Sequence, residues 1–268
     1  MSNKELVELF VSPIRECMEY KPHFGDSSRT GGYSLPDFLS LYGSDPFYSW
    51  IGLDSPYMYS AHKAAGSMTS IYRQIGIGCE RLFREVIFEK ARYKEYTSAQ
   101  WSYETETRSG KKKVLSLDGR LELSDIRDTQ IRDNVEDWIK GYLEYLDIQP
   151  RRLNGAVFEV RQGYKSKDSK RQNADLDNAT VAYSYNYLPV FTIFSSQIDN
   201  DIALRYRNGK CGILTGKPEG DIYTSLYEFS RQILDFDLAA FFQHNSTEIK
   251  NTINQILAEM FSADEAKK

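Results

Sequence analysis

Between residues 154 and 216 the sequence alternates short apolar runs with segments of helical spacing, and this alternation constrains the fold most strongly. The apolar runs are NGAVFEV, LPVFTIFSS and GKCGILTG, which begin at residues 154, 188 and 209. Each run has the length and the β-branched or aromatic content of a strand. Residues 169–187 and 198–206 predict helices between the runs. Strands with intervening helices predict an α/β fold, with a mixed central β-sheet flanked by helices.

Helical spacing also covers much of the remaining chain. We predict helices at residues 4–20, 59–94, 124–146, 219–234 and 237–261, so both terminal segments are expected to be helical. The second of these contains Gly-Ile-Gly at 76–78, where we expect a break. The third is expected to begin with Ser124 or Asp125 as its N-cap.

A hairpin and an irregular arm complete the pattern. Residues 101–107 and 114–117 alternate in twos around a turn at Ser109 and Gly110, which predicts a β-hairpin, with more strand at 121–123. Residues 21–60 are rich in glycine, serine, proline and aromatic residues, so they predict a mobile arm or a loop packed by its own aromatic side chains. Within that arm, Pro36 favours a helix start.

Composition narrows the class of protein. The 268 residues are 41% apolar and 27% charged, which is typical of a soluble globular protein. No run of about 18 apolar residues is present, so no membrane span is expected, and the start MSNKELVELF does not resemble a signal peptide. Three cysteines and three histidines lie far apart, which argues against a disulfide framework or a zinc cluster and favours a cytoplasmic location.

One segment concentrates positive charge in a chain whose net charge is −4. The segment 161–173 contains five cations against one acid, Asp168. The cations are Arg161, Lys165, Lys167, Lys170 and Arg171. An ordinary solvated loop can have this composition, but so can a surface that contacts phosphates, which needs local positive potential and not a basic chain.

Three carboxylates stand in positions suited to metal chemistry. Asp118 ends a predicted strand of the hairpin region, Glu159 lies inside a predicted strand, and Glu80 lies near a helix start. Because alternate strand residues share a face, Glu159 and Arg161 are expected on the same side. Mg²⁺ is usually held by one or two carboxylates with water and substrate phosphate, so Asp118 and Glu159 predict a Mg²⁺ site.

Each of these acids also has a structural interpretation. Asp118 precedes a glycine and could form a turn, and Glu80 could pair with a helix dipole. Glu159 with Arg161 could be a surface ion pair. The coincidence of two strand acids with an adjacent basic segment favours the metal site.

This arrangement resembles the PD-(D/E)xK nuclease superfamily, above all the type II restriction endonucleases. Asp118 matches the first acidic position, Glu159 the second, and Glu80 in GIGCERLF resembles a helix glutamate found in several of those enzymes. The chain looks most like the ApaLI-like endonucleases, from about residue 70 to 250. The resemblance implies Mg²⁺-dependent hydrolysis of phosphodiester bonds at a short, palindromic double-stranded DNA site by a homodimer. It also implies one restriction-endonuclease-like domain, with an N-terminal helix and arm at 1–60 and a catalytic core at 61–268.

The third catalytic position departs from the family pattern, because Arg161 stands where lysine is usual. Arg161, Lys165 and, less favourably, Gln162 are the candidates for this role.

We expect the basic segment to bind DNA. Lys165, Lys167 and Lys170 suit phosphates, and Arg171, Gln172 and Asn173 suit base edges. Two alternative functions stay open: a DNA-binding module without cleavage, and another Mg²⁺-dependent enzyme acting on a nucleotide.

Overall fold

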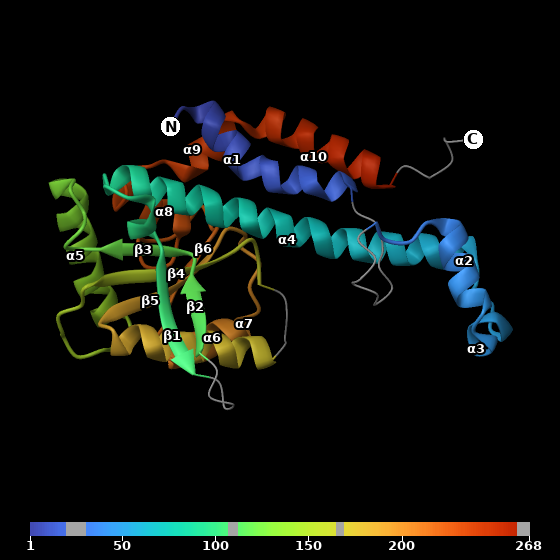
Figure 1. Ribbon diagram of the computed structural model, residues 1–268. Helices are drawn as coiled ribbons and strands as arrows, with labels where there is room; N and C mark the ends of the chain where they lie inside the picture. The colour runs from blue at the N-terminus through green and yellow to red at the C-terminus, as the bar shows by residue number, and fades with distance from the viewer. Residues whose placement is uncertain (20–30, 107–111, 165–168, 262–268) are drawn as a thin grey trace. The chain divides into compact units, whose positions relative to one another are not determined.

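The computed structural model describes residues 1–19, 31–106, 112–164 and 169–261 (Figure 1). The chain divides into two compact units, one formed by residues 1–10 and 78–246, the other by residues 11–77 and 247–268. Helices α1 (Asn3–Arg15) and α4 (Pro56–Lys90) contribute residues to both units. The predicted division into an N-terminal helix and arm at 1–60 and a catalytic core at 61–268 within one domain stays a prediction.

The first unit is built on a four-stranded mixed sheet in the order β3–β4–β5–β6. Its strands are β3 (Gly119–Glu122), β4 (Gly155–Arg161), β5 (Tyr187–Ile193) and β6 (Gly212–Thr215). β3 is antiparallel to β4, whereas β4, β5 and β6 are parallel and are joined by α6 (Ser169–Ser184) and α7 (Asn200–Asn208). The predicted α/β class with a mixed central sheet flanked by helices is therefore confirmed.

Helices α6 and α7 cover one face of this sheet. Phe191 of β5 stacks on Tyr206 of α7 with ring centroids 4.2 Å apart, and Val157 of β4 packs in one cluster with Ala182 of α6. Glu159 lies in parallel register with Phe191. It therefore faces the same helices, since strand residues alternate between faces.

The opposite face holds the aromatic core around Phe158, which is fully buried. Its ring lies 5.2 Å from Phe83 of α4, 6.3 Å from Trp138 of α5 (Thr129–Tyr145) and 5.8 Å from Phe229 of α8 (Leu226–Gln232), measured between ring centroids. Figure 1 shows the last part of α4, residues 78–90, and α6 on opposite sides of the strands. The sheet thus forms the middle of three layers.

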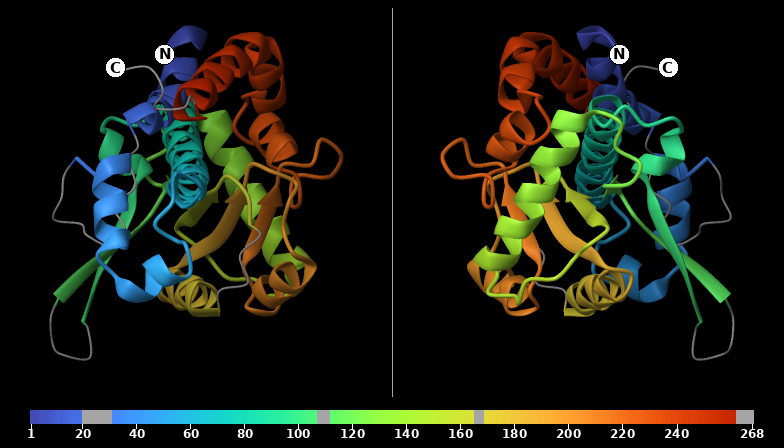
Figure 2. Two further views of the ribbon diagram at one scale, coloured as in Figure 1. Left: turned by 90° about the vertical axis from the view of Figure 1, so that its right-hand side faces the viewer. Right: turned by 90° about the vertical axis from the view of Figure 1, so that its left-hand side faces the viewer.

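The predicted hairpin is present as β1 (Trp101–Glu106) and β2 (Lys112–Leu117), which pair antiparallel. Figure 2 shows its far end extending away from the four-stranded sheet, whereas Trp101 and Tyr103 at its near end pack into the cluster around Val157. The expected turn at Ser109 and Gly110 lies outside the described residues. One residue, Asp118, separates β2 from β3.

Helix α4 runs without a break for 35 residues from Pro56 to Lys90, so the predicted break at residues 76–78 is wrong, and the helix begins three residues and ends four residues earlier than predicted. A Cβ atom at Gly78 would lie 2.3 Å from the carbonyl oxygen of Phe10 in α1. The glycine therefore permits close packing of two helices and does not interrupt one. After α4 the chain passes through the 3₁₀ helix η2 (Tyr96–Ala99).

The predicted N-cap of the next helix is wrong. Helix α5 begins at Thr129, and the side chain of Asp128 accepts a hydrogen bond from the backbone N–H of Ile131 at 3.1 Å. The hydroxyl of Ser124 instead bonds the carboxylates of Glu122 and Asp125. The residues that were expected to start the helix instead form a turn after β3.

The C-terminal segment is more divided than the two predicted helices. It forms α8, α9 (Leu238–His244) and α10 (Ser246–Phe261). Ser225 caps α8 by accepting from the backbone of Glu228, so residues 219–225 are not helical. Asn245 separates α9 from α10, where its side chain bonds Asn3 and the carbonyl of Phe241.

The regular secondary structure among the described residues of the second unit is helical, with short turns between the helices. It includes the 3₁₀ helix η1 (Glu16–Glu19), α2 (Leu35–Gly43) and α3 (Pro46–Trp50), so the irregular arm is wrong for most of residues 35–60. Ser34 forms a capping box that starts α2, with Pro36 in its first turn as predicted. Phe38 is fully buried beside Tyr42 and Tyr59.

All three cysteines are free and buried, which agrees with the expectation of no disulfide framework. Among the described residues no helix is long and apolar enough to cross a membrane.

Candidate functional site

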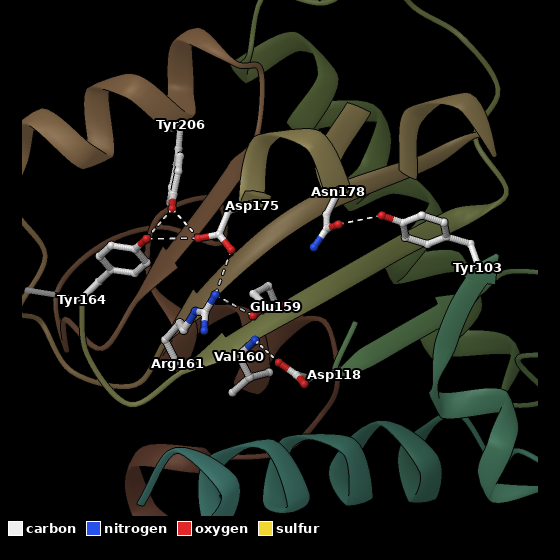
Figure 3. Close-up of polar contacts among 9 residues, drawn as sticks. All are labelled: Tyr103, Asp118, Glu159, Val160, Arg161, Tyr164, Asp175, Asn178 and Tyr206. Carbon is white, nitrogen blue, oxygen red and sulfur yellow. Dashed lines mark hydrogen bonds and ion pairs between the residues drawn. The ribbon is translucent and has the colours of Figure 1, made fainter. Parts of the chain in front are cut away.

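The fold places Asp118, at the junction of β2 and β3, beside β4, the strand that carries Glu159. The backbone N–H of Asp118 donates to the carbonyl of Phe158 at 2.8 Å. In return the backbone N–H of Val160 donates to Oδ2 of Asp118, also at 2.8 Å (Figure 3). Asp118 is therefore fixed beside β4, with its carboxylate bound between the positions of Glu159 and Arg161 along that strand. This contact exceeds what an isolated Asp-Gly turn requires.

Glu159 and Arg161 share a strand face and are in contact. Nη2 of Arg161 lies 2.7 Å from Oε1 of Glu159 and 2.9 Å from Oδ1 of Asp175 on α6. Figure 3 shows the guanidinium between the two carboxylates. The side chains of Glu159 and Arg161 are only 17% and 15% exposed, so this is not a surface ion pair. It lies at the carboxyl end of β4, where open α/β sheets commonly bind ligands.

Asp175 is a functional candidate that the sequence analysis missed. It is 5% exposed, and its Oδ2 accepts hydrogen bonds from the hydroxyls of Tyr206 at 2.6 Å and Tyr164 at 3.1 Å. The buried residues of α6 are Gln172, Asp175, Ala179 and Ala182, at helical spacing. Gln172 and Asp175 are polar residues on the side of α6 that faces the core. This position is the sequence signal that could have identified the network, because buried polar groups need hydrogen-bond partners.

The carboxylates of the site repel one another in a poorly solvated place. Burial, and then the charge of Asp118, raise the pKa of Glu159 to about 8. Burial and Asp118 likewise raise the pKa of Glu80, on α4, to about 7. Burial also raises the pKa of Asp118, although its bond from Val160 and the charge of Arg84 oppose the rise. Glu80 is thus electrostatically part of the site.

Two arginines offset part of this negative charge. Nε of Arg84 donates to the backbone carbonyl of Asp118 at 2.7 Å. Burial alone would lower the pKa of Arg161, but Glu159 and Asp175 outweigh burial and raise it. Arg161 is therefore held as a cation. Its Nε is buried and has no hydrogen-bond partner among the described residues.

The residues fit a magnesium ion held by two carboxylates. In the described part of the chain no three side chains of His, Cys, Asp or Glu form a ready metal cluster. Mg²⁺, however, commonly takes one or two carboxylates and keeps several waters. Asp118 and Glu159 supply such a pair, and their raised pKa values indicate negative charge that a cation would stabilise.

The space on the α6 side of Glu159 is small. Glu159, Asp175 and Asn178 line a cavity of about 10 Å³, which is room for about one water molecule. The hairpin contacts this side, because the hydroxyl of Tyr103 donates to Oδ1 of Asn178 at 2.6 Å (Figure 3). A hydrated cation does not fit in a cavity of this size.

The predicted DNA contacts are only partly placed. Lys165 and Lys167 lie outside the described residues, so no position tests their roles, including that of Lys165 as the alternative catalytic cation. Lys170 and Arg171 are exposed in the first turn of α6. The guanidinium carbon of Arg171 lies 5.9 Å from the ring centroid of Tyr164.

Gln172 and Asn173 are already engaged within the fold. Gln172 is 6% exposed, and its Oε1 accepts a hydrogen bond from Arg205 of α7 at 2.8 Å. Oδ1 of Asn173 accepts from the same guanidinium. These contacts fix α6 against α7, and they must be exchanged before either amide can read a base edge.

Comparison of the chain with protein-family models, with curated proteins and with solved structures gives no match.

Proposed function

We propose that this chain is a Mg²⁺-dependent type II restriction endonuclease that hydrolyses phosphodiester bonds at a short double-stranded DNA site. The observation that carries the proposal is the pair of carboxylates, Asp118 at the junction of β2 and β3 and Glu159 on the neighbouring strand β4, with the cation Arg161 beside Glu159. Their positions agree with the resemblance to the PD-(D/E)xK nucleases. The proposal includes a homodimer, because a palindromic site is most simply matched by two-fold protein symmetry.

We assign a proposed role to each residue of the candidate site from its position. Asp118 and Glu159 would hold Mg²⁺. Glu80, on α4, would influence the protonation of this pair through its electrostatic interaction with Asp118. When bound, Mg²⁺ supplies a Lewis acid that polarises the phosphoryl group and lowers the pKa of a bound water. Arg161 would stabilise negative charge on the scissile phosphate, since a guanidinium is always charged and matches phosphate geometry.

The basic segment would bind the DNA backbone near this site. Lys170 and Arg171 lie at the start of α6, whose buried residue Asp175 contacts Arg161. Because Gln172 and Asn173 contact Arg205, we favour phosphate contacts for the exposed part of this turn. Lys165 and Lys167 remain candidates for the same backbone contacts.

Plasmid cleavage tests the proposal directly. Wild-type protein with Mg²⁺ should produce discrete bands, and Asp118→Ala and Glu159→Ala should each abolish them while sequence-specific binding persists with Ca²⁺. Asp137→Ala is the matched control, because that aspartate side chain is 80% exposed on α5.

The alternatives give other results. Binding without cleavage indicates a DNA-binding module, and phosphate release from free nucleotides without DNA cleavage indicates a nucleotide-acting enzyme. A Glu159→Ala protein that cuts as well as the wild type contradicts the proposal.

A further inference from the structure

We infer that Asp175 is a positioning residue for the reaction, which acts by fixing the guanidinium of Arg161 towards the scissile phosphate. The inference rests on the proposed nuclease function and assigns a role to a residue outside the sequence motif. Asp175 itself lies on α6, behind Arg161 as seen from Glu159, and is nearly inaccessible.

The first step of the argument is the position of the cation. A single nitrogen, Nη2 of Arg161, is within 2.9 Å of both Glu159 and Asp175. In the proposed reaction the carboxylate of Glu159 also holds the metal, so it has less negative charge to offer Arg161. Asp175 lines a cavity of only about 10 Å³, too small for a hydrated cation, and does not share that role. It is therefore the contact that keeps Arg161 in place in both states.

The second step is that Asp175 is itself immobilised. Oδ1 faces Arg161, and Oδ2 accepts from both Tyr164 and Tyr206, whose hydroxyl oxygens lie 2.7 Å apart. The carboxylate is thus held from two elements, the segment after β4 and helix α7. A charged group held on both sides orients its partner closely, as supporting residues do around metal ligands and catalytic groups.

The third step explains the arginine at position 161. Lysine offers a compact point charge, whereas the planar guanidinium presents five N–H donors in a rigid fork. With one edge of the fork directed to Glu159 and Asp175, other donors remain for a phosphate. Asp175 and Arg161 would therefore depend on each other, and a lysine at 161 would need Asp175 less.

A double-mutant cycle tests this dependence. Single-turnover cleavage and DNA binding with Ca²⁺ would be measured for wild type, Asp175→Asn, Arg161→Lys and the double variant. Asparagine keeps the size of the side chain and an acceptor for Arg161. We expect Asp175→Asn to slow cleavage about 10- to 100-fold, the range for residues that support a catalytic group, with the dissociation constant for DNA changed less than about twofold.

The cycle separates positioning from general support of the fold. If Asp175 acts through Arg161, its substitution should have a much smaller effect in the Arg161→Lys background. Equal factors in both backgrounds, or Asp175→Asn cleaving at the wild-type rate, would overturn the inference. Asp177→Asn, an exposed aspartate on the same helix, is the control and should be silent.

Two further arms keep the test decisive. If Asp175→Asn does not fold, Tyr164→Phe removes one hydrogen bond to Asp175 and keeps the ring, and it should give a smaller loss that again shrinks in the Arg161→Lys background. An additive Tyr164→Phe effect counts against the inference. A wild-type protein that never cleaves DNA instead refutes the proposed function, whereas cleavage by wild type with a silent Asp175→Asn refutes only the positioning role.

Discussion

The substitution Glu159→Gln should stabilise the metal-free protein at pH 8 and leave its stability unchanged near pH 4.5. Burial and the neighbouring Asp118 raise the pKa of Glu159 from 4.5 to about 8. The folded state therefore binds this proton more tightly than the unfolded state does. Stability is lost as the pH rises from about 4.5 to about 8 and changes no further above that range.

The magnitude follows from the size of the shift. Each pKa unit corresponds to about 1.4 kcal/mol, so a rise from 4.5 to about 8 amounts to a few kcal/mol at pH 8. Glutamine keeps an oxygen that can accept from Arg161, and Asp175 remains 2.9 Å from that guanidinium. The substitution therefore does not leave a buried cation unpaired, which would otherwise cost several kcal/mol.

The assay is urea unfolding followed by circular dichroism, with EDTA present, at several pH values between 4.5 and 8.5. The free energy of unfolding of Glu159→Gln should exceed that of the wild type by a margin that grows with pH. Glu144→Gln, at an exposed position on α5, should show no such trend. Adding Mg²⁺ at pH 8 should stabilise the wild type more than Glu159→Gln. A variant that is less stable than the wild type at pH 8 would refute the electrostatic reasoning.

Two further predictions concern the DNA contacts and the helix glutamate. Lys170→Ala should weaken binding to all DNA sequences about equally, and it should make the slope of log K against log salt shallower by about one unit per lost phosphate contact. Binding titrations at several salt concentrations measure both effects. A loss of affinity confined to sites that differ at one base pair would instead show that Lys170 reads a base. Glu80→Gln should reduce cleavage only in part. Burial and Asp118 raise the pKa of Glu80 to about 7, so Glu80 becomes negatively charged as the pH rises through neutrality. The cleavage rate of the wild type should increase in this pH range, and that of Glu80→Gln should increase less. Identical pH–rate profiles would show that Glu80 takes no part.

Local periodicity in the sequence was enough to predict the sheet and the strand position of two residues of the candidate site. The apolar runs that begin at residues 154, 188 and 209 form strands, as expected, and these strands are β4, β5 and β6. Strands buried on both faces need β-branched and aromatic residues on both faces. The shared face of Glu159 and Arg161 follows from the two-residue repeat of a strand. The bond from the backbone N–H of Val160 to Asp118 places Asp118 beside the strand that carries Glu159.

Helix boundaries needed the tertiary structure. Gly78 resembles a helix breaker in the sequence, but it lies where the backbone of α1 approaches α4, and no local pattern contains that approach. The start of α5 moved to Thr129 because a turn after β3 engages Ser124. At Gly78 a contact between distant segments outweighed a weak local preference, whereas at Ser124 hydrogen bonds to the neighbouring Glu122 and Asp125 compete with helix capping.

The partners of the polar groups were likewise decided only by packing. Asp175 is 14 residues beyond Arg161 and 31 residues before Tyr206, and these groups meet because α6 and α7 lie on the face of the sheet that carries Glu159. The same packing turns Gln172 towards Arg205 and away from the role suggested by its residue type. Sequence spacing sets which side of a helix or strand a residue occupies, whereas the choice of partner depends on which elements pack together.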